Sequence, residues 1–210
     1  MRVTYLFDPL CGWCYGAGPM LERLGQLDDV TLELMPTGLF AGEGARAMDA
    51  QFAAYAWQND ERIARLTGQP FSEVYRSRVL GHAGGMFDSA PATLGLIAVR
   101  LTEPAREREA LGALQRARYV DGQDIVSLAG VGEILQSIGL FAAAERLRTP
   151  DQELKQTYHR RLEAARSEMR RFGISGVPTL LVGGDTERQL LPGNLLFGRF
   201  DLLVSQLQAA

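Results

Sequence analysis

Apolar and polar positions follow two different periods near the start of the chain. Residues 2–7 are β-prone and stop at Asp8-Pro9, and residues 30–35 alternate like a strand. Between these two runs, apolar residues recur at helical spacing: Met20, Leu21, Leu24 and Leu27. The segment therefore predicts a β-α-β unit, with two parallel strands joined by a right-handed crossover.

The middle of the chain, from about residue 45 to 148, has a helical pattern almost throughout. Glycine and proline interrupt it at residues 68–70, 81–85, 103–104 and 121–122, which leaves room for about five helices. A longer helix is predicted from about Asp151 to Phe172, because its apolar residues lie on one side, and Gly173 ends it.

The last part of the chain returns to short apolar runs. Residues 179–182 and 188–191 predict two strands of a hairpin around a turn at 183–185, and residues 195–207 predict a closing helix. The two ends therefore predict an α/β unit formed by residues 1–40 and 150–210. Residues 41–149 are expected to be a large all-helical insertion into it.

Composition and charge narrow the class of protein. A chain of 210 residues with 46% hydrophobic residues is long enough and apolar enough for one sizeable core. The net charge is -3 with both signs interleaved, which does not favour a nucleic-acid partner. No run reaches the roughly 18 apolar residues of a membrane span, and residues 1–7 do not resemble a secretory signal. We therefore expect a soluble, cytoplasmic protein.

The chain has only two cysteines, Cys11 and Cys14, in the stretch FDPLCGWCYG. This spacing allows a redox pair, half of a zinc site, a small structural disulfide, or coincidence. A zinc site needs two more ligands, and the only histidines, His82 and His159, lack the usual spacing. A structural disulfide would close too small a loop to stabilise the fold much, and cytosolic thiols are kept reduced. No metal site is predicted, and a redox pair is favoured.

A helix that begins at the first cysteine would explain the spacing. The free N–H groups of the first turn and the helix dipole favour the thiolate, which is the reactive form of the thiol. An offset of three residues brings the second sulfur to the same helical face. Cys11 can then attack a disulfide, and Cys14, one turn further in, can resolve the mixed disulfide.

A second stretch, GISGVPTLLV at residues 173–182, bears on the same question. Val177-Pro178 stands directly before an apolar run, where a cis peptide bond is possible because the second residue is proline. Taken alone, Pro178 is better explained by a proline that starts an edge strand. Together with the cysteine pair, it belongs to a longer order of elements along the chain.

The order strand, Cys-x-x-Cys, helix, strand, helical block, helix, Gly-Val-Pro-Thr, hairpin and helix resembles the DsbA-like family of the thioredoxin fold over the whole chain. The stretch DPLCGWCYG is similar to the FrnE-type branch, whose pattern is Asp-x-x-Cys-Pro-Trp-Cys-Tyr. The resemblance implies that Cys11 is the nucleophile and Cys14 the resolving thiol. It also implies that Pro178 is the cis-proline beside them, and that the Val177 backbone pairs with substrate as an added strand.

One residue departs from the FrnE-type pattern. Gly12 stands where that pattern has proline. The two residues between the cysteines help to set the redox potential, and members of the wider fold span potentials of about -270 to -120 mV. The sequence therefore leaves open whether the protein is an oxidant, a reductant or an isomerase.

Three further side chains are candidates for supporting roles. Trp13 is expected to be partly exposed, either as an apolar platform for a peptide or glutathione, or packed against the insertion. Asp8 is expected to cap the following helix or to transfer a proton near Cys14. His82, in a glycine-rich loop of the helical block, is expected to line the substrate cleft.

These features predict a thiol-disulfide oxidoreductase that exchanges disulfides with proteins or with glutathione. Its redox group is the Cys11–Cys14 disulfide, and no other cofactor is predicted. One alternative is an enzyme like the kappa-type glutathione transferases and isomerases, although a serine usually stands there in place of Cys11. A second alternative is a peptide-binding chaperone without redox chemistry. The sequence does not predict an oligomeric state.

Overall fold

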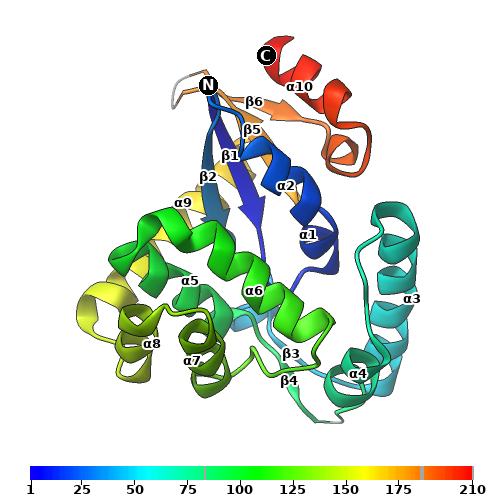
Figure 1. Cartoon of the computed structure of the whole chain (residues 1–210), viewed down its shortest axis with the longest axis vertical. Helices are drawn as coiled ribbons and strands as arrows, with labels where there is room; N and C mark the ends of the chain where they lie inside the picture. Colours follow the sequence, from blue (N-terminus) through cyan, green and yellow to red (C-terminus); the bar gives the residue numbers. More distant parts are fainter. Residues whose placement is uncertain (83, 185–186, 210) are drawn as a thin grey trace.

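A four-stranded mixed sheet forms one half of the molecule, and a block of helices forms the other (Figure 1). The computed structural model describes residues 1–82, 84–184 and 187–209. The sheet half consists of β1 (Arg2–Phe7), α1 (Gly12–Gly16), α2 (Gly18–Leu24), β2 (Thr31–Pro36), α9 (Gln152–Arg171), β5 (Thr179–Val182), β6 (Gln189–Leu191), the 3-10 turn η4 (Gly193–Phe197) and α10 (Phe200–Ala209). Both chain ends lie near the start of β1, at the top of the view (Figure 1).

The strand order is β2-β1-β5-β6, with β1 at the centre of the pairing. β1 runs parallel to β2 and antiparallel to β5, and Leu6 lies opposite Thr179. Because β1 and β5 run in opposite directions, the chain that leaves β1 meets the chain that enters β5. This register brings the segment with Cys11 beside the segment with Pro178, although 166 residues separate Cys11 from Val177.

The two faces of the sheet bury different sets of side chains. Alternate residues of a strand point to opposite faces. Tyr5 and Phe7 therefore join the larger core with α1, α2 and α10. Leu6 lies on the other face, where it forms a smaller cluster with Met35, Ala165 and Leu181 beneath α9.

The helical block lies between β2 and α9 in the chain. Its helices are α3 (Ala50–Thr67), α4 (Glu73–Tyr75), α5 (Ala90–Thr102), α6 (Glu107–Tyr119), α7 (Leu128–Ser137) and α8 (Phe141–Arg148). Shorter turns are η1 (Gly42–Gly44), η2 (Arg76–Leu80) and η3 (Pro104–Arg106), and β3 (Arg46–Ala47) pairs with β4 (Met86–Phe87). α3 packs against α1, and a Cβ at Gly16 would lie 2.5 Å from Ile63 Cγ2, so this close approach needs glycine.

Buried residues of the helical block and of the sheet half belong to the same core cluster. Tyr5 and Leu24 from the sheet half share it with Leu96 and Leu114 from the block. We expected one part made of residues 1–40 and 150–210 and another made of residues 41–149. These two parts differ in topology but share one hydrophobic core. None of the helices that the structure describes combines the length and the apolar character needed to cross a bilayer.

Most of the predicted elements are confirmed, and three differ. The helix expected after the cysteines is two helices that meet at Ala17, with Pro19 in the first turn of α2, where proline is tolerated. The closing helix begins at Phe200, because residues 193–197 form a 3-10 turn. The β3–β4 ladder was not predicted, since two residues carry no strand period. Asp185, in the predicted hairpin turn, lies outside the described residues.

Candidate active site

Cys11 lies where the chain leaves β1 and enters α1. It is the N-cap residue of α1, and its own N–H donates to Asp8 O (3.1 Å). Its thiol donates to the Val177 carbonyl oxygen, with 3.6 Å between Sγ and O. The Cys11 side chain is 7% exposed and that of Cys14 is 1% exposed, and both thiols are free. Cys11 is the more exposed of the two, but both side chains are buried, so the prediction that Cys11 is the accessible thiol is not borne out by its exposed surface.

The loop that faces Cys11 carries the second predicted feature. The Val177–Pro178 peptide bond is cis, and Val177 contributes the carbonyl that accepts from the Cys11 thiol. Both parts of the prediction, the cis bond and the position of the loop at the cysteine, are confirmed. Val177 and Pro178 are only half-buried, so part of this loop stays open beside the sulfur.

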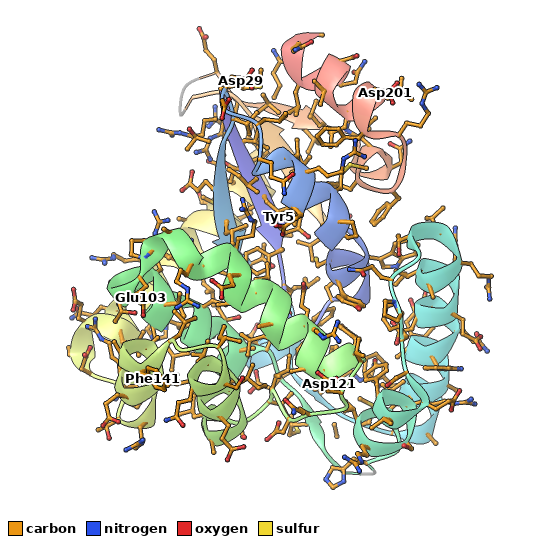
Figure 2. The ribbon with its side chains drawn as sticks, in the orientation of Figure 1. Tyr5, Asp29, Glu103, Asp121, Phe141 and Asp201 are labelled. Carbon is orange, nitrogen blue, oxygen red and sulfur yellow. The ribbon has the colours of Figure 1, made fainter. Side chains whose placement is uncertain are left out.

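Cys14 is one turn further into α1 and is enclosed by core side chains. Tyr5, which lies on the face of β1 that α1 and α2 cover (Figure 2), donates its hydroxyl to Cys14 O (3.3 Å). Burial raises the pKa of the Cys14 thiol well above its usual value, and the hydrogen bond and charge of Cys11 raise it further. Cys14 is therefore held as a thiol in the reduced protein, which suits a residue that acts second.

This arrangement predicts which thiol reacts first with a small alkylating reagent. We expect brief treatment of the reduced protein with iodoacetamide to label Cys11 at least about tenfold faster than Cys14, because Cys14 is buried and protonated. Mass mapping of the two cysteines at a series of times measures the two rates. Faster labelling of Cys14 would contradict the assignment of the two roles.

Asp8 is fully buried and links three segments of the chain. Its Oδ1 accepts from Leu10 N (2.9 Å), and its Oδ2 accepts from Phe40 N (3.1 Å) and from the Ser89 hydroxyl (2.7 Å). The prediction that Asp8 caps the helix is wrong, because the N-cap is Cys11 and no side chain caps α1. Asp8 instead ties the loop before Cys11 to Phe40, just before the helical block, and to Ser89, the N-cap residue of α5 in the block.

Asp8 also affects the pKa of the Cys14 thiol. Its backbone lowers the pKa of the Cys14 thiol through a hydrogen bond, and its charge raises that pKa, both less strongly than burial does. Burial raises the pKa of the Asp8 carboxyl itself, and hydrogen bonds from the Phe40 and Leu10 N–H groups oppose that shift. Proton transfer between Asp8 and Cys14 stays a prediction.

Trp13 stands between the two cysteines and is half-buried. Its ring meets Phe197 of η4 edge-on, with 5.1 Å between centroids, and the Arg62 guanidinium of α3 lies 5.6 Å from the ring centroid. Trp13 therefore packs against the helical block and against the end of the sheet half. Its exposed part is available as a platform next to Cys11, so both expectations for this residue remain compatible with its position.

In the part of the chain that the structure describes, neither His82 nor His159 is joined to the cysteine pair by a hydrogen bond, ion pair or ring contact, and the His159 ring meets that of Tyr158. His82 is exposed, and among the described residues no hydrogen bond, ion pair or ring contact joins its side chain to Cys11, Cys14 or Pro178. The prediction that His82 lines the substrate cleft gains no support from its position. Within residues 1–82, 84–184 and 187–209, no three side chains of His, Cys, Asp or Glu gather as ligands for a metal ion.

Sequence reasoning missed a buried polar group beneath α1. Asp60 of α3 is 4% exposed, and its Oδ2 accepts from the Tyr75 hydroxyl (2.9 Å). Burial raises the pKa of Asp60 to about 7, although the Tyr75 hydrogen bond and the positive charge of Arg118 lower it. Tyr119 of α6 donates to Leu10 O (2.8 Å), the carbonyl directly before Cys11. One signal was available: Asp60 stands three residues before Ile63, on the apolar side of its helix.

The chain is similar to known proteins over its whole length. The family model of the DSBA-like thioredoxin domain matches residues 2–208. The chain superposes on the cytosolic disulfide reductase DsbM from Pseudomonas aeruginosa with a TM-score of 0.86 at 30% sequence identity, over 100% of both chains. The structure of the same reductase with GSH gives a TM-score of 0.85 at 29% identity, over 99% of this chain and 100% of that one.

A third structure is also similar over nearly its whole length. A proposed protein disulfide isomerase from Nitrosomonas europaea has a TM-score of 0.80 and 27% identity, with 99% of this chain and 98% of that chain covered. A search of curated proteins gave no match. The family match and the three structures therefore agree in fold class from one end of the chain to the other.

Proposed function

The chain belongs to the family of DSBA-like thioredoxin domains and is a thiol-disulfide oxidoreductase. From this premise we propose that it is a cytoplasmic disulfide reductase, in which Cys11 is the nucleophile and Cys14 the resolving thiol. Its substrates are protein disulfides or mixed disulfides with glutathione, and glutathione returns it to the reduced form. No cofactor other than the Cys11–Cys14 disulfide takes part.

The observation that carries the proposal is the position of the Cys11 sulfur. It lies at the N-cap of α1 and 3.6 Å from the carbonyl oxygen of Val177, which precedes the cis-proline. The free N–H groups at the start of a helix favour an anion at that place. A disulfide laid against the half-buried Val177–Pro178 loop therefore presents a sulfur atom to Cys11 at the start of this helix.

The proposed reaction has two exchange steps. The Cys11 thiolate attacks one sulfur of the substrate disulfide, a Cys11–sulfur bond forms, and the other substrate sulfur leaves as a thiolate that takes up a proton. Cys14 then loses its proton and attacks the Cys11 sulfur, which releases the second substrate thiol and leaves the Cys11–Cys14 disulfide. Two glutathione molecules reverse these steps and are oxidised to glutathione disulfide.

The proposed direction and partner rest on the similarity to DsbM. That protein is described as a cytosolic disulfide reductase, and one of its structures contains GSH. We place the exchange chemistry in residues 1–40 and 150–210, which contain both cysteines and Pro178. The inserted residues 41–149 supply one wall of the site, where Arg62 lies over Trp13.

The trapped intermediate tests this proposal. We expect Cys14→Ser, incubated with glutathione disulfide, to gain the mass of one glutathionyl group on Cys11, because the adduct cannot be resolved. Intact-mass measurement and peptide mapping identify the adduct, and Cys11→Ser is the matched control that should gain none. Absence of the adduct on Cys14→Ser, with Cys11 still free to alkylate, would contradict glutathione as a partner.

A further inference from the structure

We infer that Tyr5 assists the second exchange step, in which Cys14 attacks the Cys11 sulfur, by donating a hydrogen bond from its hydroxyl to the Cys14 sulfur as that sulfur becomes a thiolate. The inference deepens the proposed function and rests on the order of attack given there. It adds a residue of the central strand to the two cysteines, and it concerns the release of the substrate and not its capture.

Tyr5 is fixed in the interior of the sheet half. Its side chain is 0% exposed, and its ring stacks on that of Phe7, with 5.5 Å between centroids and 3° between planes. It pairs in register with Leu34 of β2 and with Leu180 of β5, so a neighbouring strand holds it on each side. The hydroxyl that meets Cys14 of α1 therefore comes from a rigid element and is shielded from water (Figure 2).

The Tyr5 hydroxyl has one proton and two acceptors on the same residue. Its bond to the Cys14 carbonyl oxygen is 3.3 Å long, which is beyond the usual O–H···O range of about 2.5–3.0 Å and therefore weak. The hydroxyl also forms a hydrogen bond with the Cys14 side chain. A thiol sulfur is a weak acceptor, whereas hydrogen bonds to an ionised acceptor are roughly twice as strong as neutral ones. The O–H group should therefore turn from the carbonyl to the sulfur when Cys14 ionises.

Cys14 needs such a donor because it reacts from a buried position. Burial raises the pKa of its thiol well above the usual value, although it is the thiolate that attacks a disulfide. Cys11 also acts on this pKa, as does Asp8, through its backbone N–H and through its charge. In the mixed disulfide Cys11 is bonded to the substrate and carries no charge. The thiolate that forms there is then left with Tyr5 and the Asp8 N–H as donors and with the Asp8 carboxyl as an opposing group.

Tyr5 stays a donor throughout the step. Burial raises the pKa of its phenol well above the usual value, and the charges of Cys14 and Cys11 raise it further. The hydroxyl therefore keeps its proton at neutral pH, and the proton that Cys14 loses passes to the solution. The Cys14 thiolate forms a bond to the Cys11 sulfur, the bond from Cys11 to the substrate sulfur breaks, and the substrate leaves with that electron pair as a thiolate.

The test follows the two steps separately with the aromatic disulfide dithiobis(nitrobenzoate), which releases one yellow thiolate at each exchange. When reduced protein is mixed rapidly with a high concentration of this reagent, the rate of the first release depends on the concentration and reports the attack by Cys11. The second release is independent of concentration and reports the attack by Cys14. Cys14→Ser, which should show the first release alone, identifies the two phases.

Tyr5→Phe removes the hydroxyl and keeps the ring. We expect it to slow the second release about three- to tenfold at pH 7, because less Cys14 is thiolate, while the thiolate that remains is more nucleophilic and offsets about half of the loss on a logarithmic scale. The first release should stay within about twofold of the wild type. Because both rates come from one trace, an unchanged first release also shows that the variant is folded.

Tyr15→Phe is the matched control. Tyr15 directly follows Cys14, and its hydroxyl donates to the Pro70 carbonyl oxygen (3.1 Å), so this variant loses a bond of the same kind that does not involve a sulfur. Both of its releases should stay within about twofold of the wild type. A second release that Tyr15→Phe slows as much as Tyr5→Phe does would overturn the inference, because any loss of a tyrosine hydroxyl near α1 would then suffice.

The pH profile separates a hydrogen bond to the thiolate from a defect in packing. As Cys14 ionises at higher pH, the donor no longer changes the fraction of thiolate, so the second-release rates of Tyr5→Phe and wild type should converge between pH 7 and about pH 10. A packing defect slows the step by the same factor at every pH. Equal second-release rates at pH 7, an equal slowing of both releases, or a factor that does not change with pH would each overturn the inference.

The reagent contains no glutathione, so this result is independent of the partner proposed above. If Cys14→Ser gains no glutathionyl group while Tyr5→Phe slows the second release, glutathione fails as the partner and the role of Tyr5 stands. If the adduct forms and Tyr5→Phe releases both thiolates at the wild-type rates, the role of Tyr5 fails alone.

Discussion

Replacing Cys11 by serine is expected to remove disulfide reduction, with a loss of at least about a thousandfold, because a hydroxyl does not ionise near neutral pH and does not attack sulfur. Stability should be kept, since the side chain is at the N-cap of α1 and serine is a favourable N-cap residue. The loss is therefore one of chemistry and not of folding. The initial rate of reduction of a glutathionylated peptide, measured by fluorescence, checks it.

Cys14→Ser is the matched variant, because it removes the same atom one turn along the same helix. The first exchange should proceed at close to the wild-type rate, and turnover should stop at the mixed disulfide, which Cys14 would otherwise resolve. One equivalent of product per protein should therefore appear in a burst. A Cys11→Ser protein that shows this burst, or a Cys14→Ser protein that shows none while Cys11 is intact, would contradict the assigned order of attack.

The parts of this site that the sequence predicts are those whose signals are local. Cys11, Cys14 and the Val177-Pro178 step are each read from a few adjacent residues, and the apolar runs around them predict β1 and β5. The antiparallel register of those two strands then brings both stretches together. The likeness to a known family placed Pro178 beside the cysteines in advance, whereas the register that brings it there was not predicted, because spacing alone does not state which strand pairs with which.

The parts that the sequence did not predict depend on contacts between distant segments. Asp60 reaches Gly12 only because α3 packs on α1; the position of Asp60 on the apolar side of α3 indicates burial but not which helix α3 meets. Asp8 was expected to act on the helix directly after it, whereas its partner hydroxyl, that of Ser89, is 81 residues away. The expectation for His82 rested on residue type and a glycine-rich loop, and neither determines where a loop lies.

The Asp8 carboxyl accepts hydrogen bonds from its neighbour Leu10 and from the distant residues Phe40 and Ser89. Its removal should therefore have a large effect on stability. Asp8→Ala leaves two backbone N–H groups and the Ser89 hydroxyl without their acceptor in the interior. Each buried donor left unsatisfied costs about 1–3 kcal/mol. We therefore expect the free energy of unfolding to fall by about 3–5 kcal/mol, which is a large share of the total for a domain of this size.

Two milder substitutions show which part of that loss comes from hydrogen bonding. Asp8→Asn keeps one oxygen acceptor but turns an amide N–H₂ towards a backbone N–H, so its loss should be smaller, about 1–3 kcal/mol. Ser89→Ala removes a single donor and leaves the Asp8 carboxyl with two backbone partners, so its loss should be the smallest of the three. The expected loss in the free energy of unfolding is largest for Asp8→Ala, smaller for Asp8→Asn and smallest for Ser89→Ala.

Urea denaturation at pH 7, followed by circular dichroism, measures these losses, and an unchanged slope with urea shows that the unfolded state is not altered. Asp29→Ala is the control, because Asp29 is an exposed aspartate close to the chain ends (Figure 2) and should change stability by no more than about 0.5 kcal/mol. If Asp8→Ala is as mild as Asp29→Ala, the three hydrogen bonds do not hold the cysteine loop to the helical block. A loss of several kcal/mol for Asp8→Ala, beside a small one for Asp29→Ala, would assign that function to Asp8.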